Sequence, residues 1–322
     1  MTDQFGRNIN YLRISITDRC NLRCFYCMPQ QPEQLCHSDI LSYEEITKLA
    51  ALAASLGISK IRITGGEPLV RKDCAKLIAM LKQIDGIQTV AMTTNGTLLE
   101  QALPELCQAG LDAVNISIDT VQEACWRQIT GYVGNMPDWT DLLRKCIGYG
   151  LKTKVNAVLL QETREEWIQL STLAEHLPID VRFIEQMPIG QGKTCESDTA
   201  QAVLQQLRKQ WHDLYGIEKQ ETGSPAQYYT SEALAGRIGL ITPISHPFCH
   251  ACNRIRLTST GQLKPCLSYG QHTDLRTFLR CGASENELRS ILYQCMYEKP
   301  QHHCFAEQTE LAEQQTMNRI GG

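Results

Sequence analysis

Two sets of three cysteines in this chain have the spacing of metal ligands. The first set forms a Cys-x3-Cys-x2-Cys loop of Cys20, Cys24 and Cys27, directly after a β-rich run. Three thiolates from one short loop can bind three irons of a four-iron, four-sulfur cluster, and the open fourth iron indicates chemistry rather than a purely structural role. A structural zinc site would need four closed ligands. Cys36, the next thiol, has a different spacing.

The second set consists of Cys249, Cys252 and Cys266, near the C-terminal end of the chain. Three cysteines again leave one metal position without a thiolate, which fits a second open-site cluster. His246 or His250 could instead supply a fourth ligand. A zinc ribbon therefore remains an alternative for this set on ligand count alone.

The first loop, with Tyr26 directly before its last cysteine, resembles the radical S-adenosylmethionine superfamily. The resemblance implies that the methionine end of S-adenosylmethionine binds the open iron, so that electron transfer releases a 5′-deoxyadenosyl radical. It also assigns Gly66 and Glu67 to the methionine, Ser117 to the ribose and Met187 to the adenine. Taken alone, these residues fit an ordinary strand–helix turn, a helix N-cap and core packing.

The residues around the second set resemble the GTP 3′,8-cyclase family of molybdenum cofactor biosynthesis. The similarity lies in the stretch 248–267 and in a terminal Gly321-Gly322 pair like the family's own tail, which reaches into the active site. It implies a second four-iron, four-sulfur cluster whose open iron binds guanine. The adenosyl radical would take the ribose C3′ hydrogen of GTP, and the sugar radical would attack C8 to give 3′,8-cyclo-7,8-dihydro-GTP.

The same resemblance implies several partners. A reductant would supply electrons to the clusters, and a downstream synthase would convert the product to cyclic pyranopterin monophosphate. Family members often form dimers, so a homodimer is expected from the resemblance, whereas the residues themselves indicate no oligomeric state.

GTP also needs cations, because a buried triphosphate must be paired. The chain offers basic residues on several expected strands, and their alternative role is a solvated strand edge. Lys60 and Arg62 are separated by one residue and therefore share a face of their strand. The candidate substrate residues, including those that the resemblance adds, are Arg13, Lys60, Arg62, Thr93, Lys154, Arg254, Ile255 and Arg256.

Composition narrows the class of protein. The chain has 322 residues, 43% of them hydrophobic and 20% charged, which is typical of a globular protein. Its net charge of −4 argues against a general nucleic-acid surface. No apolar run approaches the ~18 residues of a membrane span, and the polar start lacks a signal segment, so we expect no membrane association and a cytoplasmic location.

Six β-rich runs alternate with helical patterns in the first part of the chain. We expect strands at residues 11–16, 58–64, 88–94, 113–118, 152–158 and 181–185. This alternation predicts an α/β fold, an incomplete (β/α)6 TIM-like barrel, with functional groups at the carboxyl ends of the strands. The pattern changes near Pro188, so we expect a partial barrel at residues 1–190 and a C-terminal cluster region at residues 191–322.

Two other functions compete with the cyclase interpretation. One is a radical S-adenosylmethionine enzyme that modifies peptides, although such enzymes usually carry more C-terminal cysteines. The other is a non-enzymatic binding module in which zinc only folds small loops. Cleavage of S-adenosylmethionine would separate the enzymes from the module.

Overall fold

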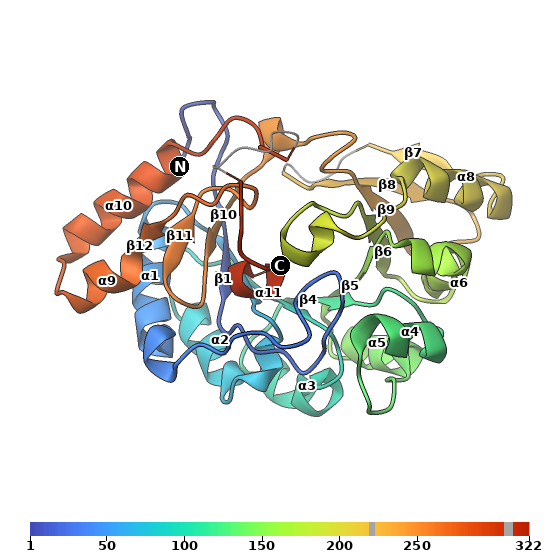
Figure 1. Cartoon of the computed structure of the whole chain (residues 1–322), viewed down its shortest axis with the longest axis horizontal. Coiled ribbons are helices and arrows are strands. Elements are labelled where there is room, and N and C mark those ends of the chain that lie inside the picture. The colour runs from blue at the N-terminus through green and yellow to red at the C-terminus, as the bar shows by residue number, and fades with distance from the viewer. Residues whose placement is uncertain (219–222, 306–311, 322) are drawn as a thin grey trace.

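One twelve-stranded sheet organises the computed structural model, which describes residues 1–218, 223–305 and 312–321. The spatial order of its strands is β12-β11-β10-β1-β2-β3-β4-β5-β6-β9-β8-β7 (Figure 1). The six strands expected from the sequence are β1 (Tyr11–Ser15), β2 (Lys60–Thr64), β3 (Thr89–Thr94), β4 (Ala113–Ser117), β5 (Lys152–Val158) and β6 (Asp180–Ile184). They pair in chain order and in parallel, so the incomplete barrel is confirmed.

The C-terminal part of the chain extends this sheet at both edges. Strand β9 (Arg237–Ile241) pairs in parallel with β6, and β10 (Arg254–Leu257) pairs in parallel with β1. Four short antiparallel strands, which the sequence analysis did not predict, complete the edges: β7 (Tyr215–Ile217), β8 (Ala226–Thr230), β11 (Gln262–Lys264) and β12 (Thr273–Asp274). Both parts of the chain contribute strands to one sheet, so the strand pairing marks no boundary at residue 190. The division at this residue stays a prediction.

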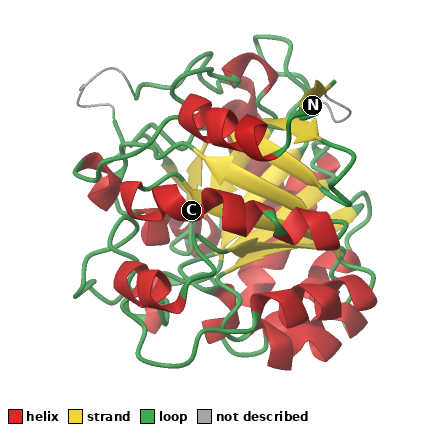
Figure 2. Cartoon of the chain, turned by 90° about the vertical axis from the view of Figure 1, so that its right-hand side faces the viewer, coloured by secondary structure: helices red, strands yellow, loops and turns green. Residues whose placement is uncertain are grey.

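Helices lie on the outside of the strands (Figure 2). Those between the barrel strands are α1 (Tyr43–Ser55), α2 (Cys74–Lys82), α3 (Leu99–Gln108), α4 (Glu123–Thr130), α5 (Trp139–Gly148), α6 (Trp167–Ser171) and α7 (Leu173–His176). A capping box begins α1, since Ser42 accepts a hydrogen bond from the backbone of Glu45 and Glu45 accepts one from the backbone of Ser42. Helix α4 was not predicted.

The later helices are α8 (Ala200–Gln210), α9 (Leu275–Arg280), α10 (Glu285–Tyr297) and α11 (Met317–Ile320). Helix α8 ends at Gln210, because the backbone of Trp211 is already extended. None of the helices among the described residues has the length and apolar character to cross a membrane.

Side chains alternate across the barrel wall, as the two-residue period of a strand requires. In β1, Leu12 and Ile14 are buried in the hydrophobic core, whereas Tyr11 and Arg13 line the interior cavity. Polar groups thus face the inside of the barrel, while apolar groups pack beneath the helices.

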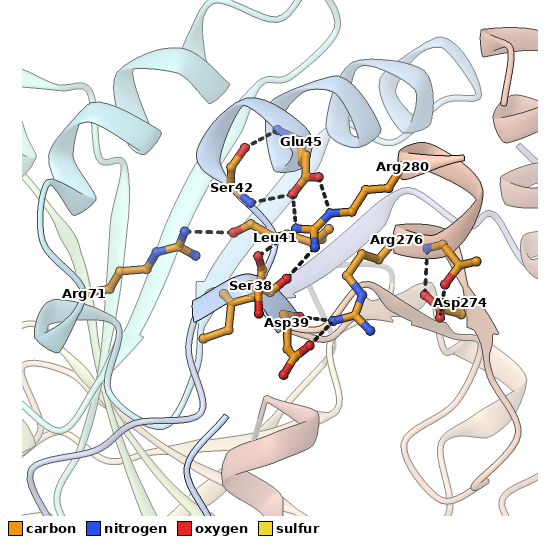
Figure 3. A network of polar contacts seen from close by, with 11 residues as sticks. Ser38, Asp39, Leu41, Ser42, Glu45, Arg71, Asp274, Arg276 and Arg280 are labelled. Carbon is orange, nitrogen blue, oxygen red and sulfur yellow. Dashed lines mark hydrogen bonds and ion pairs between the residues drawn. The ribbon is translucent and has the colours of Figure 1, made fainter. Parts of the chain in front are cut away.

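Arginines of α9 fasten the segment that follows the first cysteine loop (Figure 3). Arg276 donates to the backbone oxygen of Asp39 at 2.5 Å. Arg280 forms an ion pair with Glu45 at 2.7 Å and also donates to the backbone oxygen of Ser38. The C-terminal part of the chain therefore holds residues near the first loop in place.

Candidate active site

The first cysteine loop begins directly after β1 and is held by the turn after β2. Gly66 N–H donates to the oxygen of Thr17 at 2.8 Å, and Glu67 N–H donates to the oxygen of Arg19 at 2.8 Å. A Cβ atom on Gly66 would lie 2.5 Å from the Arg19 oxygen. The glycine is therefore required by close approach of the cysteine loop itself, a reason that the sequence analysis did not foresee.

Burial shapes the chemistry of the first set of thiols. Burial, with the neighbouring charges of Cys20 and Asp119, raises the pKa of Cys27 to about 12. Burial likewise raises the pKa of Cys24 well above its ordinary value, and neighbouring Cys27 adds to this effect. The thiols interact electrostatically with one another, so a bound iron centre would stabilise the thiolates that burial alone disfavours.

Tyr26 is fixed by a buried carboxylate. Its hydroxyl donates to Asp119 Oδ2 at 2.7 Å, while Asp119 Oδ1 accepts from the backbone N–H of Val158 at 2.8 Å. Burial raises the pKa of Asp119. Asp119, at the end of β4, was missed from the sequence, although its place two residues after Ser117 puts it at a carboxyl end of a parallel strand.

Two charged residues support the second set of cysteines. Arg7 Nη1 donates to the oxygen of Cys249 at 3.0 Å, and Lys299 Nζ donates to the oxygen of Pro265 at 2.6 Å. Burial opposes ionisation of Cys252, but the positive charges of Lys299, Arg254 and Arg7 prevail and lower its pKa to about 7. The two sets thus lie in electrostatically different surroundings.

Both sets line one cavity of about 440 Å³. Most of the residues singled out in the sequence also line it: Arg13, Cys20, Cys24, Tyr26, Cys27, Lys60, Arg62, Gly66, Thr93, Ser117, Lys154, Met187, Cys249, Cys252, Arg254, Arg256 and Cys266. The cavity therefore brings the two cysteine sets and the basic residues into a single site.

Glu67 and Ile255 do not line this cavity among the described residues. Glu67 is fully buried and accepts hydrogen bonds from Leu69 N–H, Thr94 Oγ1 and Asn95 N–H. Desolvation raises the pKa of Glu67 to about 7. Ile255 lies in the core, because it alternates with Arg254 and Arg256 along β10. Their assigned roles in binding stay predictions.

The cations stand in rows across neighbouring strands. Arg13 of β1 is in register with Arg256 of β10 on one side and with Arg62 of β2 on the other. Tyr11, in the next row, is in register with Arg254 and Lys60. Like charges placed side by side on a sheet repel one another, so these rows favour an anionic ligand.

The pKa values of residues in these rows reflect the high density of positive charge. Burial, followed by the charge of Arg254, lowers the pKa of Arg256 to about 10. Desolvation opposes ionisation of the half-buried Tyr11, yet the neighbouring charges of Arg62, Arg13 and Lys60 lower its pKa to about 7, and Arg62 Nε donates to its hydroxyl at 2.5 Å. The Nε and Nη2 atoms of Arg254 are buried and have no hydrogen-bond partner in the described part of the chain.

Several lining residues were not predicted. Arg182 of β6 is buried, faces the cavity and donates to Asn156 at 2.6 Å. Asn95 Nδ2 donates to Cys20 Sγ at 3.8 Å. Tyr11, Lys299 and Asp119 also belong to this group. A signal for Arg182 was available in the sequence, because it is a basic residue in the middle of an interior strand.

The histidines considered as zinc ligands lie elsewhere. His246 and His250 are both exposed, and neither lines the cavity. Within the described residues, no three His, Cys, Asp or Glu side chains are grouped closely enough to hold a single metal ion. The two cysteine sets nevertheless line the same cavity.

The fold and the three-cysteine loop define a radical S-adenosylmethionine enzyme. The model of the radical SAM superfamily matches residues 14–174, and that of Molybdenum Cofactor Synthesis C matches residues 179–305. The crystal structure of Streptococcus suis SuiB bound to S-adenosylmethionine has a similar fold, with a TM-score of 0.64 and 18% identity, over 92% of this chain and 67% of that one. Superfamily membership implies a four-iron, four-sulfur cluster and S-adenosylmethionine as cofactors.

Curated relatives specify the family further. A GTP 3′,8-cyclase of Clostridium perfringens strain SM101 is 40% identical over 100% of both chains. A GTP 3′,8-cyclase of Heliobacterium modesticaldum is 43% identical, again over 100% of both chains. The chain therefore belongs to the GTP 3′,8-cyclase family.

Proposed function

We propose that this protein catalyses the radical cyclisation of GTP to 3′,8-cyclo-7,8-dihydro-GTP, the first step of molybdenum cofactor biosynthesis. The observation that carries the proposal is the shared cavity in which two three-cysteine sets face rows of cations. Full-length identity of 40–43% to GTP 3′,8-cyclases supports the choice of GTP.

The first set, Cys20, Cys24 and Cys27, would hold a four-iron, four-sulfur cluster. Reduction of this cluster and cleavage of S-adenosylmethionine supply the adenosyl radical that removes the C3′ hydrogen of GTP. In this proposal Tyr26, Gly66, Glu67, Ser117 and Met187 orient S-adenosylmethionine. Four of the five line the cavity, and Tyr26 is held rigidly by Asp119.

Cys249, Cys252 and Cys266 would hold a second four-iron, four-sulfur cluster with an open iron for guanine. Their common position on the cavity wall and their mutual electrostatic interaction support this role. Lys299 and Arg7 would favour the thiolate form there, since their charges lower the pKa of Cys252. They also fix the backbone of the loop through the oxygens of Pro265 and Cys249.

The cations would bind the triphosphate of GTP. Arg13, Arg62 and Arg256 form one row, and Arg254 and Lys60 flank the next. A polyanion would relieve their repulsion and satisfy the buried nitrogens of Arg254. Lys154 forms an ion pair with Asp180 at 2.8 Å. A contact with GTP would therefore require the Lys154 ammonium group to be shared between the phosphates and the Asp180 carboxylate. Thr93 and the Ile255 backbone complete the proposed set.

The wider setting of the reaction is part of the same proposal. An external reductant would supply electrons, and a cyclic pyranopterin monophosphate synthase would take the product. We further propose a cytoplasmic homodimer, and a division of function between residues 1–190 and 191–322.

The test is an anaerobic assay after reconstitution with iron and sulfide. With dithionite and S-adenosylmethionine, we expect 5′-deoxyadenosine to form faster with GTP than without it, together with a cyclised product. Formation that ignores GTP would leave the superfamily intact and exclude GTP as substrate. The absence of 5′-deoxyadenosine would contradict the radical mechanism.

A further inference from the structure

A C-terminal strap, residues 312–321, contacts both cysteine loops. Ala312 bridges to Tyr269, and Glu313 N–H donates to the oxygen of Ser268 at 2.8 Å, so the strap starts beside the loop of Cys266. Met317 lines the cavity. Figure 1 shows α11 and the C-terminal end of the strap near the middle of the molecule. Gly322 lies outside the described residues.

The strap reaches the first cysteine loop through Asn318, which is buried. Its side-chain Nδ2 donates to the oxygen of Asp18, two residues before Cys20, at 3.1 Å. The strap therefore holds the backbone that leads into the first cysteine loop.

The strap also meets the cation rows. Arg256 Nη1 donates to the oxygen of Gly321 at 2.6 Å. Gly321 has a φ of 75°, and a Cβ atom there would lie 2.8 Å from Thr64 Oγ1. The end of the strap is thus packed closely against β2 while it orients a cation of the site.

A buried ion pair holds the other end of the strap. Lys264 Nζ lies 2.5 Å from Glu313 Oε2, and the two side chains are 0% and 2% exposed. Lys264 Nζ also donates to the oxygen of Tyr269 at 2.7 Å, and Glu313 Oε1 accepts from Gln315 N–H at 2.7 Å. Such a pair gains little net stability after desolvation, but it selects one arrangement of the groups that carry it.

We propose that Lys264 and Glu313 are positioning residues, which anchor the strap so that Asn318 contacts Asp18 and Gly321 contacts Arg256. Through this anchor, the loop of the second cysteine set determines the surroundings of the first. The consequence for catalysis rests on the proposed function. A fixed strap ensures that each adenosyl radical that forms abstracts a hydrogen from GTP.

The test compares Glu313→Gln with wild type in the reconstituted holoenzyme. Gln keeps the shape and removes the charge that opposes Lys264. We expect hydrogen–deuterium exchange of the amides in residues 312–321 to become faster by roughly tenfold or more. The ratio of 5′-deoxyadenosine to cyclised product should also rise by roughly tenfold, since small misplacements strongly slow the productive step.

Arg319→Gln is the matched control. Arg319 lies on the same strap, but its ion pair with Glu33 is largely exposed, so neither exchange nor product ratio should change. A double variant, Lys264→Met with Glu313→Gln, removes both buried charges and restores charge balance if the single variant fails to fold. We expect this double variant to fold with a fast-exchanging strap.

Unchanged exchange of residues 312–321 in a folded Glu313→Gln or double variant would overturn the anchor. Faster exchange with an unchanged product ratio would overturn the coupling. The exchange measurement needs no GTP, so a failure of the proposed function, seen as no cyclised product from wild type, is distinguishable from a failure of the anchor.

Discussion

Arg13 and Arg256 lie directly opposite each other in the parallel register of β1 and β10. They are separated by most of the chain, and Arg62 of β2 continues the row on the other side of Arg13. Because like charges in such positions repel, the row of arginines lowers the stability of the folded protein, and an anionic ligand offsets this loss. The pairing of β1 with β10 therefore joins the first cysteine loop, the second cysteine loop and a polyanion site.

Arg254→Met should separate substrate binding from stability. The Nε and Nη2 atoms of Arg254 are buried without a hydrogen-bond partner among the described residues, so the uncharged side chain should raise the free energy of unfolding of the apo-protein by about 1 kcal/mol. The KM for GTP should rise by roughly tenfold or more, because a charge-assisted contact is lost. Denaturant unfolding and steady-state kinetics measure the two effects.

Arg144→Met is the control, since Arg144 is exposed on α5. It should change neither quantity. A loss of stability in Arg254→Met without a change in KM would show that Arg254 is structural.

Replacement of one cysteine should have a different effect on the reaction in each of the two cysteine sets. Cys24→Ala should abolish cleavage of S-adenosylmethionine, because the first cluster loses a ligand. Cys266→Ala should retain part of this cleavage and lose cyclisation, since it affects only the second set. Quantification of 5′-deoxyadenosine and of cyclised product separates these results. Equal retention of cyclase activity in both variants would contradict the assignment.

Tyr11 should give the apo-protein a distinct pH dependence. Its positive neighbours lower its folded pKa from 10.0 to about 7. A depressed pKa contributes stability that is fully present above the unfolded value and is lost as pH falls through about 7. The stability of wild type relative to Tyr11→Phe should therefore increase from pH 7 to pH 10.

Near-ultraviolet titration should show one tyrosinate forming near pH 7 in wild type and not in Tyr11→Phe. Bound GTP should raise this pKa, because its phosphates compete for the same cations. A stability difference that does not vary over this pH range would refute the electrostatic account of Tyr11.

Gly66→Ala should disrupt the first cluster while the fold survives. The new Cβ would stand 2.5 Å from the oxygen of Arg19 and force the cysteine loop to move. We expect about half the iron of wild type after reconstitution, since only one of the two proposed clusters is affected. Gly148→Ala is the control: nothing lies within 4 Å of its Cβ, so its iron content should be normal. Full iron loading of Gly66→Ala would show that the loop tolerates the shift.

Local patterns in the sequence were enough to predict the barrel and both cysteine sets. The pattern of short β-rich runs predicted the ends of six parallel strands to within about two residues. In β1, for example, Leu12 and Ile14 differ clearly in polarity from Tyr11 and Arg13. The four short edge strands were missed, since runs such as Gln262–Lys264 are too short to show a period.

Contacts between residues far apart in the chain could not be predicted from the sequence. No local signal places Arg256 beside Arg13, or Asn318 against Asp18. Glu67 was expected to receive an ammonium group, but its hydrogen bonds to Thr94 and Asn95 depend on the pairing of neighbouring loops. Gly66 was recognised, yet the reason for a glycine there is the backbone of Arg19.

The most direct test of the central claim follows the hydrogen itself. GTP deuterated at C3′ is incubated anaerobically with the reconstituted enzyme, dithionite and S-adenosylmethionine, and the 5′-deoxyadenosine is analysed by mass spectrometry. Hydrogen abstraction from C3′ predicts 5′-deoxyadenosine that carries one deuterium, in step with the cyclised product. Unlabelled 5′-deoxyadenosine formed alongside that product would contradict the mechanism.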